Sequence, residues 1–67
     1  MTELQKQINR LKACQESCRK RQDELLALAK EATEKGYDIQ FHKIKKLINN
    51  EINEYNRLQD LIDSYQD

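Results

Sequence analysis

The chain contains no proline and a single glycine, Gly36, among its 67 residues. These two residue types are common in the tight turns of folded proteins, so this chain has few residues suited to the turns that connect the strands of a sheet. Charged residues make up 36 % of the sequence, which is typical of long helices with solvated faces. The composition therefore predicts an all-α fold.

Long apolar runs and an excess of one charge are also absent. The longest apolar run, residues 25–29, is far shorter than the roughly 20 residues that cross a bilayer. Twelve Lys and Arg balance twelve Asp and Glu, so no net positive charge drives nonspecific binding to nucleic acid. The N-terminus lacks the apolar stretch of a secretory signal. We therefore expect a cytoplasmic protein, with no membrane partner, whose cysteines are thiols.

Two heptad patterns occupy most of the chain. Apolar residues and a few polar ones recur at alternating steps of four and three in both halves, as expected for amphipathic helices. The first series is Leu4, Ile8, Leu11, Gln15, Cys18, Gln22, Leu25, Ala29 and Ala32. The second is Phe41, Ile44, Ile48, Glu51, Tyr55, Leu58, Ile62 and Tyr65. When the chain folds back at Gly36, opposed residues have numbers that sum to 73.

This register predicts an antiparallel, coiled-coil-like two-helix hairpin, with helices over about 3–35 and 39–65, in one domain spanning 1–67. Thr2 and Gln5 form a Thr-x-x-Gln capping box for the first helix. Lys35 followed by Gly36 marks its end, and we expect Asp38 to cap the second helix. Midway, Gln22 lies opposite Glu51, where the amide can donate to the carboxylate and fix the register at some cost in stability.

One flank of this seam is apolar. Leu28 falls opposite Leu47, and Cys14 falls opposite Leu61. Monomeric proteins seldom leave such a strip in water, so the strip indicates a face that another protein or a second copy covers. The alternative is that these leucines only widen the core of the hairpin itself.

The two flanks differ in polarity. Arg21 and Glu54 stand in the middle of the apolar flank, where we expect an ion pair, while the other flank is mixed and places Arg19 near Ile52. The predicted partner-binding residues are Cys14, Leu28, Leu47, Leu61 and Ile52.

The sequence predicts no catalytic residue, no metal site and no cofactor, and therefore no enzyme. Cys14 and Cys18 could supply two metal ligands, but two ligands do not complete a zinc site. His42 lies near the turn, about 20 Å along the hairpin from Cys18. A two-helix hairpin also lacks the deep pocket in which catalytic groups converge.

Self-association or a larger partner is expected on physical grounds. A chain this short buries a small core, and two long helices leave much of each other uncovered. One alternative is a homodimeric four-helix bundle that binds nucleic acid, or acts as a regulator, through the basic cluster Arg19, Lys20 and Arg21. The acidic residues Asp23 and Glu24 follow at once, which favours a solvated face over phosphate contacts.

The chain resembles the YscE family, small hairpin co-chaperones of type III secretion needle subunits. The resemblance lies in the total length, in the opening Met1-Thr2 with Leu4, Gln7 and Ile8, and in Gln40-Phe41 after a glycine-containing turn. It implies a partner chaperone built of tetratricopeptide-like helical repeats, which this hairpin would stabilise. It further implies that the pair keeps a needle subunit unpolymerised and soluble.

Overall fold

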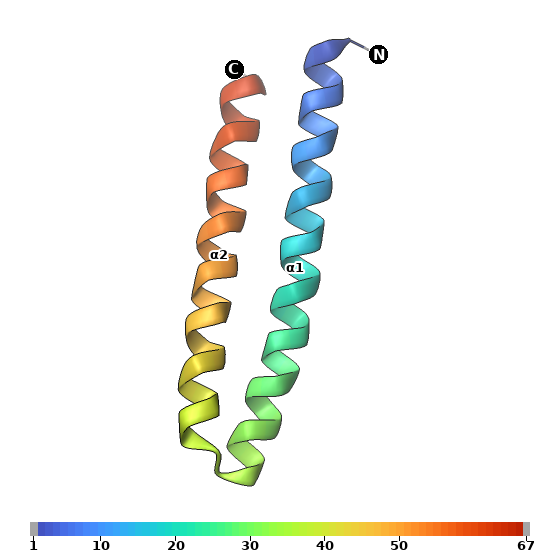
Figure 1. Ribbon diagram of the computed structural model, residues 1–67. Helices are drawn as coiled ribbons and strands as arrows, with labels where there is room; N and C mark the ends of the chain where they lie inside the picture. The colour runs from blue at the N-terminus through green and yellow to red at the C-terminus, as the bar shows by residue number, and fades with distance from the viewer. Residues whose placement is uncertain (1, 67) are drawn as a thin grey trace.

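The computed structural model describes residues 2–66, which form two long helices joined by a short turn. Helix α1 spans Glu3–Lys35 and helix α2 spans Asp38–Gln66. They lie side by side and antiparallel along their whole length (Figure 1). The predicted all-α hairpin is confirmed. The predicted bounds of α1 match, and α2 extends one residue further at each end.

The start of α1 follows the predicted cap. Thr2 is extended, with φ −72° and ψ 159°, and its side chain accepts a hydrogen bond from the Gln5 amide at 3.1 Å. This bond satisfies one of the amides that a helix N-terminus leaves without an intrahelical partner. The second half of the capping box is wrong, because the side-chain amide of Gln5 donates to Asn9 Oδ1 at 3.1 Å and supports the next turn instead of reaching back to Thr2.

The end of α1 is a Schellman motif centred on Gly36, which has φ 73° and ψ 26°. The Gly36 amide donates to the carbonyl of Thr33 at 3.2 Å, and the Tyr37 amide donates to the carbonyl of Ala32 at 2.9 Å. Glycine takes this left-handed conformation without the steric conflict that a Cβ would create. The only glycine of the chain therefore stands where the backbone requires it.

The expected role of Asp38 is wrong by one position. The Phe41 amide donates to the carbonyl of Tyr37 at 2.9 Å, which makes Tyr37 the residue that precedes the first turn of α2. Asp38 is the first helical residue, where its negative charge interacts favourably with the positive end of the helix. The turn is correspondingly short, and Gly36 with Tyr37 completes it.

The heptad seam forms the core. The buried side chains are those of Ile8, Gln15, Cys18, Ala32, Leu58 and Ile62. The half-buried ones include the seam residues between them, from Leu11 to Ala29 on α1 and from Phe41 to Tyr55 on α2. Only the open end departs from the pattern, because Leu4 is 49 % exposed and Tyr65 is 42 % exposed. Leu4 lies in the first turn of α1, beyond the end of α2 in this register, and Tyr65 lies in the last turn of α2.

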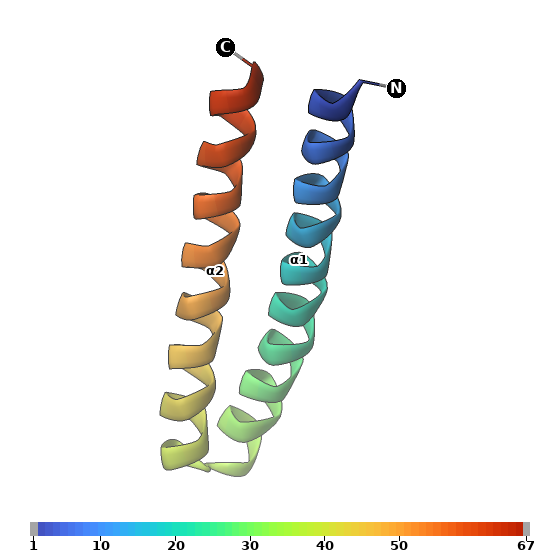
Figure 2. The ribbon, with the colours of Figure 1, turned by 45° about the horizontal axis from the view of Figure 1, so that its top comes forward.

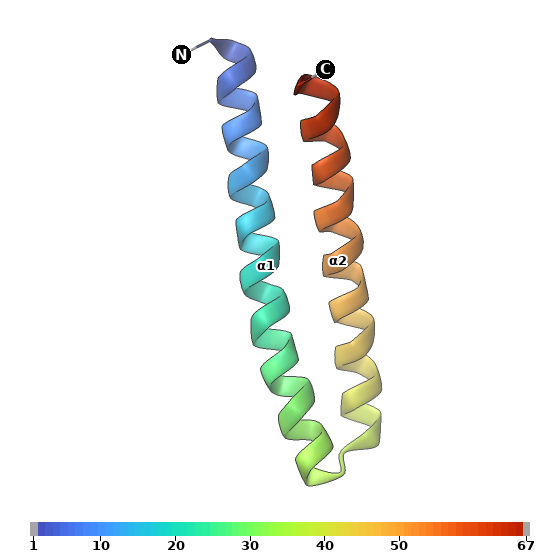
Figure 3. The same cartoon turned by 180° about the vertical axis from the view of Figure 1, so that it is seen from behind.

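The hairpin is thin and elongated, as two views from other directions show (Figures 2 and 3). Its principal extents are 51, 16 and 11 Å, and its radius of gyration is 15.5 Å, against about 11 Å for a compact domain of this length. The accessible surface is 5317 Å², roughly 870 Å² more than the average folded monomer of 8.0 kDa exposes. Much side-chain surface is thus left without cover.

Candidate protein-binding groove

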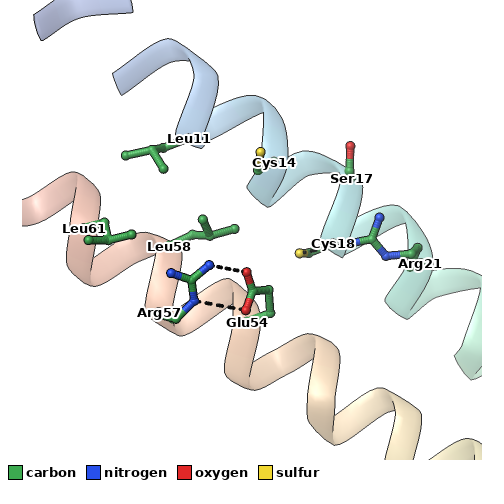
Figure 4. Close-up of a pocket in the computed structure, with 9 residues that line it drawn as sticks. All are labelled: Leu11, Cys14, Ser17, Cys18, Arg21, Glu54, Arg57, Leu58 and Leu61. Atoms are coloured by element: carbon green, nitrogen blue, oxygen red, sulfur yellow. Dashed lines mark hydrogen bonds and ion pairs between the residues drawn. The ribbon is translucent and has the colours of Figure 1, made fainter. Parts of the chain in front are cut away.

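The apolar flank of the seam is hollowed at two places. The first hollow lies in the half of the hairpin nearer the open end and has a volume of about 570 Å³ (Figure 4). Helix α1 contributes Cys14 and Cys18 to it, and α2 contributes Leu58 and Leu61. The full lining is Leu11, Cys14, Ser17, Cys18, Arg21, Glu54, Arg57, Leu58 and Leu61.

The second hollow is smaller, about 270 Å³, and lies nearer the turn. It is lined by Arg21, Glu24, Leu25, Leu28, Leu47 and Glu51. Arg21 lines both hollows, so the two are parts of one groove that runs along the hairpin. We call this surface, from Cys14 and Leu61 to Leu28 and Leu47, the flank groove.

The structure brings four of the five predicted partner-binding residues into the flank groove and leaves them open to solvent. Leu28 and Leu47 are each 50 % exposed, Leu61 is 37 % exposed, and Cys14 is exposed. The hairpin does not enclose these leucines in its own core. Each instead forms part of an apolar wall that faces water.

Ile52, the fifth predicted residue, lies elsewhere. It is 40 % exposed but lines neither hollow of the flank groove. Five residues of helix place it roughly 140° around α2 from Leu47, on the opposite flank. Ile52 is therefore not part of the flank groove, and its role in partner binding stays a prediction.

Charged side chains occupy the centre of the flank groove, in pairs that the sequence did not predict. Arg21 Nε donates to Glu51 Oε1 at 3.0 Å rather than to Glu54, and Glu51 therefore pairs with Arg21 and not with Gln22. Glu54 instead pairs with Arg57, whose Nε donates to Glu54 Oε2 at 3.1 Å. An arginine side chain can reach one helical turn in either direction, so the heptad position alone does not choose its partner.

The ion pair of Arg21 and Glu51 lies beside the buried thiol of Cys18. Arg21 Nη2 lies 3.3 Å from Cys18 Sγ. Burial raises the pKa of the Cys18 thiol, and the nearby Glu51 carboxylate adds to this rise. The hydrogen bond from Arg21 holds the pKa of Glu51 below its ordinary range. The groove centre thus carries an arginine and a carboxylate, both charged near neutral pH, and a protonated thiol.

A second polar layer crosses the seam at Gln15, which is only 8 % exposed. Gln15 Nε2 donates to Gln59 Oε1 at 2.9 Å and lies 3.4 Å from the Tyr55 carbonyl. The sequence placed Gln15 against Leu58 but gave no sign of Gln59, which lies just beside the seam. Gln59 is one residue from Leu58, and Glu51 is one residue from Ile52, which is the position opposite Arg21 when numbers sum to 73, so both bonds agree with the register.

Metal ligands and membrane spans are not found in residues 2–66. No group of three or more His, Cys, Asp or Glu side chains is placed to hold a metal ion among them. Cys14 is exposed, Cys18 is buried, and both are free thiols. His42 is exposed and packs edge-on against Phe41, with ring centroids 5.9 Å apart. Neither described helix has the length and apolar character needed to cross a bilayer.

Comparisons with models of protein families, with curated proteins and with solved structures give no match for this chain.

Proposed function

We propose that this chain is a non-enzymatic protein-binding module that docks through the flank groove on an α-helical partner. One observation carries the proposal. The leucines Leu28, Leu47 and Leu61 form an apolar strip that the hairpin leaves 37–50 % exposed. A strip of this kind, rimmed by charged side chains, is the usual sign of a protein interaction site.

The shape of the groove favours a helix as its occupant. Leu47 and Leu61 lie fourteen residues apart on α2, which is about 21 Å along the helix axis. A partner helix laid along the groove could place one apolar side chain in each hollow, and polar groups against Arg21 and Glu51 between them. This is the helix-in-groove mode of recognition, in which apolar anchors recur on one face of the bound helix.

The finer proposal follows from the resemblance to the YscE family. The partner would be a cytoplasmic chaperone built of helical repeats, and the hairpin would act as its co-chaperone. Together they would keep a type III secretion needle subunit soluble. The long hairpin and its uncovered groove support such a role, since covering helical surface is what this family is understood to do. The identity of the partner comes from the resemblance alone.

The test is co-expression of this chain with a helical-repeat chaperone encoded next to it, followed by a binding measurement on the purified proteins. Leu28 and Leu47 are each half exposed, so covering the rest of either side chain is worth about 0.8–1.5 kcal/mol. Leu28→Asp and Leu47→Asp should therefore each weaken binding at least about fourfold. Leu26→Asp is the matched control. Leu26 is on the same helix as Leu28 and is 54 % exposed, but it lines neither hollow of the groove.

Equal weakening by the Leu26 and Leu28 variants would show that the flank groove is not the docking surface. Helicity measured by circular dichroism separates lost binding from lost folding. If the chaperone binds the wild-type chain but the solubility of the needle subunit does not change, the chain is a protein-binding module and the co-chaperone role is wrong.

A further inference from the structure

We propose that a second copy of the chain covers the flank groove when no other partner is present. The two copies would be related by a two-fold axis that runs parallel to the helices, with both turns at the same end of a four-helix bundle. This inference uses the flank groove of the proposed function, but it is tested on the purified chain alone.

The groove is a set of repeating layers. Along α1, Cys14, Arg21 and Leu28 are spaced seven residues apart, and along α2 the positions opposite them are Leu61, Glu54 and Leu47. Seven residues are two helical turns, or about 10.5 Å, so the three layers are evenly spaced along one face. The outer layers are apolar and the central layer is charged.

Two symmetric arrangements bring apolar layers onto apolar layers. With the axis parallel to the helices, α1 faces α2 of the second copy in the same layer. Leu28 then lies against Leu47 of the second copy, and Arg21 lies against Glu54 of the second copy. With the axis across the helices, each helix faces its own equivalent, and Cys14 lies against Leu28 of the second copy.

Charge complementarity selects the first arrangement. The axis across the helices would place Arg21 against Arg21 of the second copy and Glu54 against Glu54 of the second copy, at the centre of a partly desolvated interface. Like charges brought together in such a setting cost several kcal/mol. The parallel axis instead gives two opposite-charge contacts, and each extends a pair that already exists within one copy, Arg21 with Glu51 and Glu54 with Arg57.

The available area suits a dimer. The face of the hairpin measures 51 by 16 Å, which is about 800 Å² for each copy and matches the share that each partner buries in a standard interface. The surplus of exposed surface, roughly 870 Å² relative to a compact monomer, is of the same size. Pairing would also bury the thiol-lined hollow at Cys14, whose wall is Leu61.

Association is measured first, by sedimentation equilibrium of the purified chain over a range of concentrations. The wild-type chain should show a reversible monomer–dimer equilibrium. A two-fold interface contains each leucine twice and Leu28 is half exposed in the monomer, so Leu28→Asp should raise the dimer Kd by at least about tenfold. Leu26→Asp, outside the groove, should leave the Kd within a few-fold of wild type.

The arrangement is measured second, with the native Cys14 as the reporter. Wild-type chain is mixed with a tagged Cys14→Ser, Leu61→Cys variant, or with a tagged Cys14→Ser, Leu28→Cys variant, and mildly oxidised. Each chain then has one exposed thiol, because Cys18 is only 1 % exposed. The tag separates mixed disulfides from identical pairs. The parallel axis predicts the mixed disulfide with the Leu61 variant in clear excess.

Three results would overturn the proposal: a wild-type chain that stays monomeric at every concentration, a dimer that Leu28→Asp does not weaken, or cross-linking that favours the Leu28 variant or neither variant. None of these decides the proposed function, because binding to a helical-repeat chaperone is measured with a different protein present. Conversely, a chain that dimerises as described but does not bind that chaperone would support the dimer and contradict the proposed function.

Discussion

The turn permits a sharp prediction, because the structure separates backbone strain from steric contact at Gly36. A methyl group at this position would meet no atom within 4 Å, its chain neighbours aside. Its φ of 73° nevertheless lies in the left-handed region, which costs an L-residue about 1–2 kcal/mol. Alanine also lowers the conformational entropy of the unfolded chain, and this effect offsets about 0.4–1 kcal/mol of that cost. Gly36→Ala should therefore destabilise the hairpin by about 1 kcal/mol.

The mirror-image residue gives the opposite expectation. D-alanine prefers positive φ and would place its methyl group without strain, so only the effect on the unfolded chain remains. Replacing Gly36 with D-alanine in a chemically synthesised chain should stabilise it by about 0.4–1 kcal/mol. For a chain of 67 residues, 1 kcal/mol corresponds to a shift in Tm of about 7 °C.

The assay is thermal unfolding followed by circular dichroism, at one fixed protein concentration because association also shifts Tm. The L-alanine chain should melt below the glycine chain, and the D-alanine chain above it. Equal lowering of Tm by both alanines would refute the reasoning, because it would point to a steric clash or a lost contact instead of backbone handedness. An L-alanine chain that melts with the glycine chain would refute it equally.

Three further predictions concern the seam and the groove. Gln15→Leu should raise stability by less than about 1 kcal/mol, since burial of a leucine, about 1.5–3 kcal/mol, slightly exceeds the net value of the two hydrogen bonds of Gln15, about 1 kcal/mol each. Chemical denaturation checks this result against Gln15→Ala, which should lose stability. Because Arg21 lowers the pKa of Glu51, the stability from this pair is complete above the ordinary carboxyl pKa and is lost as the pH falls through the lowered value. Acid unfolding of Glu51→Gln should accordingly show a weaker dependence on pH there. At low protein concentration, where the chain is monomeric, Cys14 should react rapidly with a thiol reagent, while Cys18, with its raised pKa and 1 % exposure, should react only as the hairpin opens.

The sequence predicted the seam because burial in a helix pair follows one simple period. Every described seam residue between Ile8 and Ile62 is buried or half-buried, and the helix ends fell where Thr2 and Gly36 placed them. The same period placed Leu28 and Leu47 beside the seam, but it left open whether the core of the hairpin would cover them. Periodicity thus determined the fold and four of the five residues proposed for the site.

The errors concern side-chain partners and the start of α2. Arg21 chose Glu51 over Glu54, and Gln15 found Gln59, because long flexible side chains select among several partners within reach. Asp38 lay inside the helix instead of before it, since helix ends shift by a residue with the exact turn geometry. Ile52 lies on the flank where the sequence placed it, apart from the groove, and its role in partner binding stays a prediction.

The matched lengths of the two helices restrict how this gene can change. Loss of one residue from the middle of α1 would rotate everything before it by about 100° and carry Ile8 away from its opposite residue on α2. Insertions and deletions should therefore be tolerated at the Gly36–Tyr37 tip, or as seven-residue blocks removed together from both helices, which would shorten the hairpin by about 10 Å. Natural length variants of this protein should differ by such paired blocks.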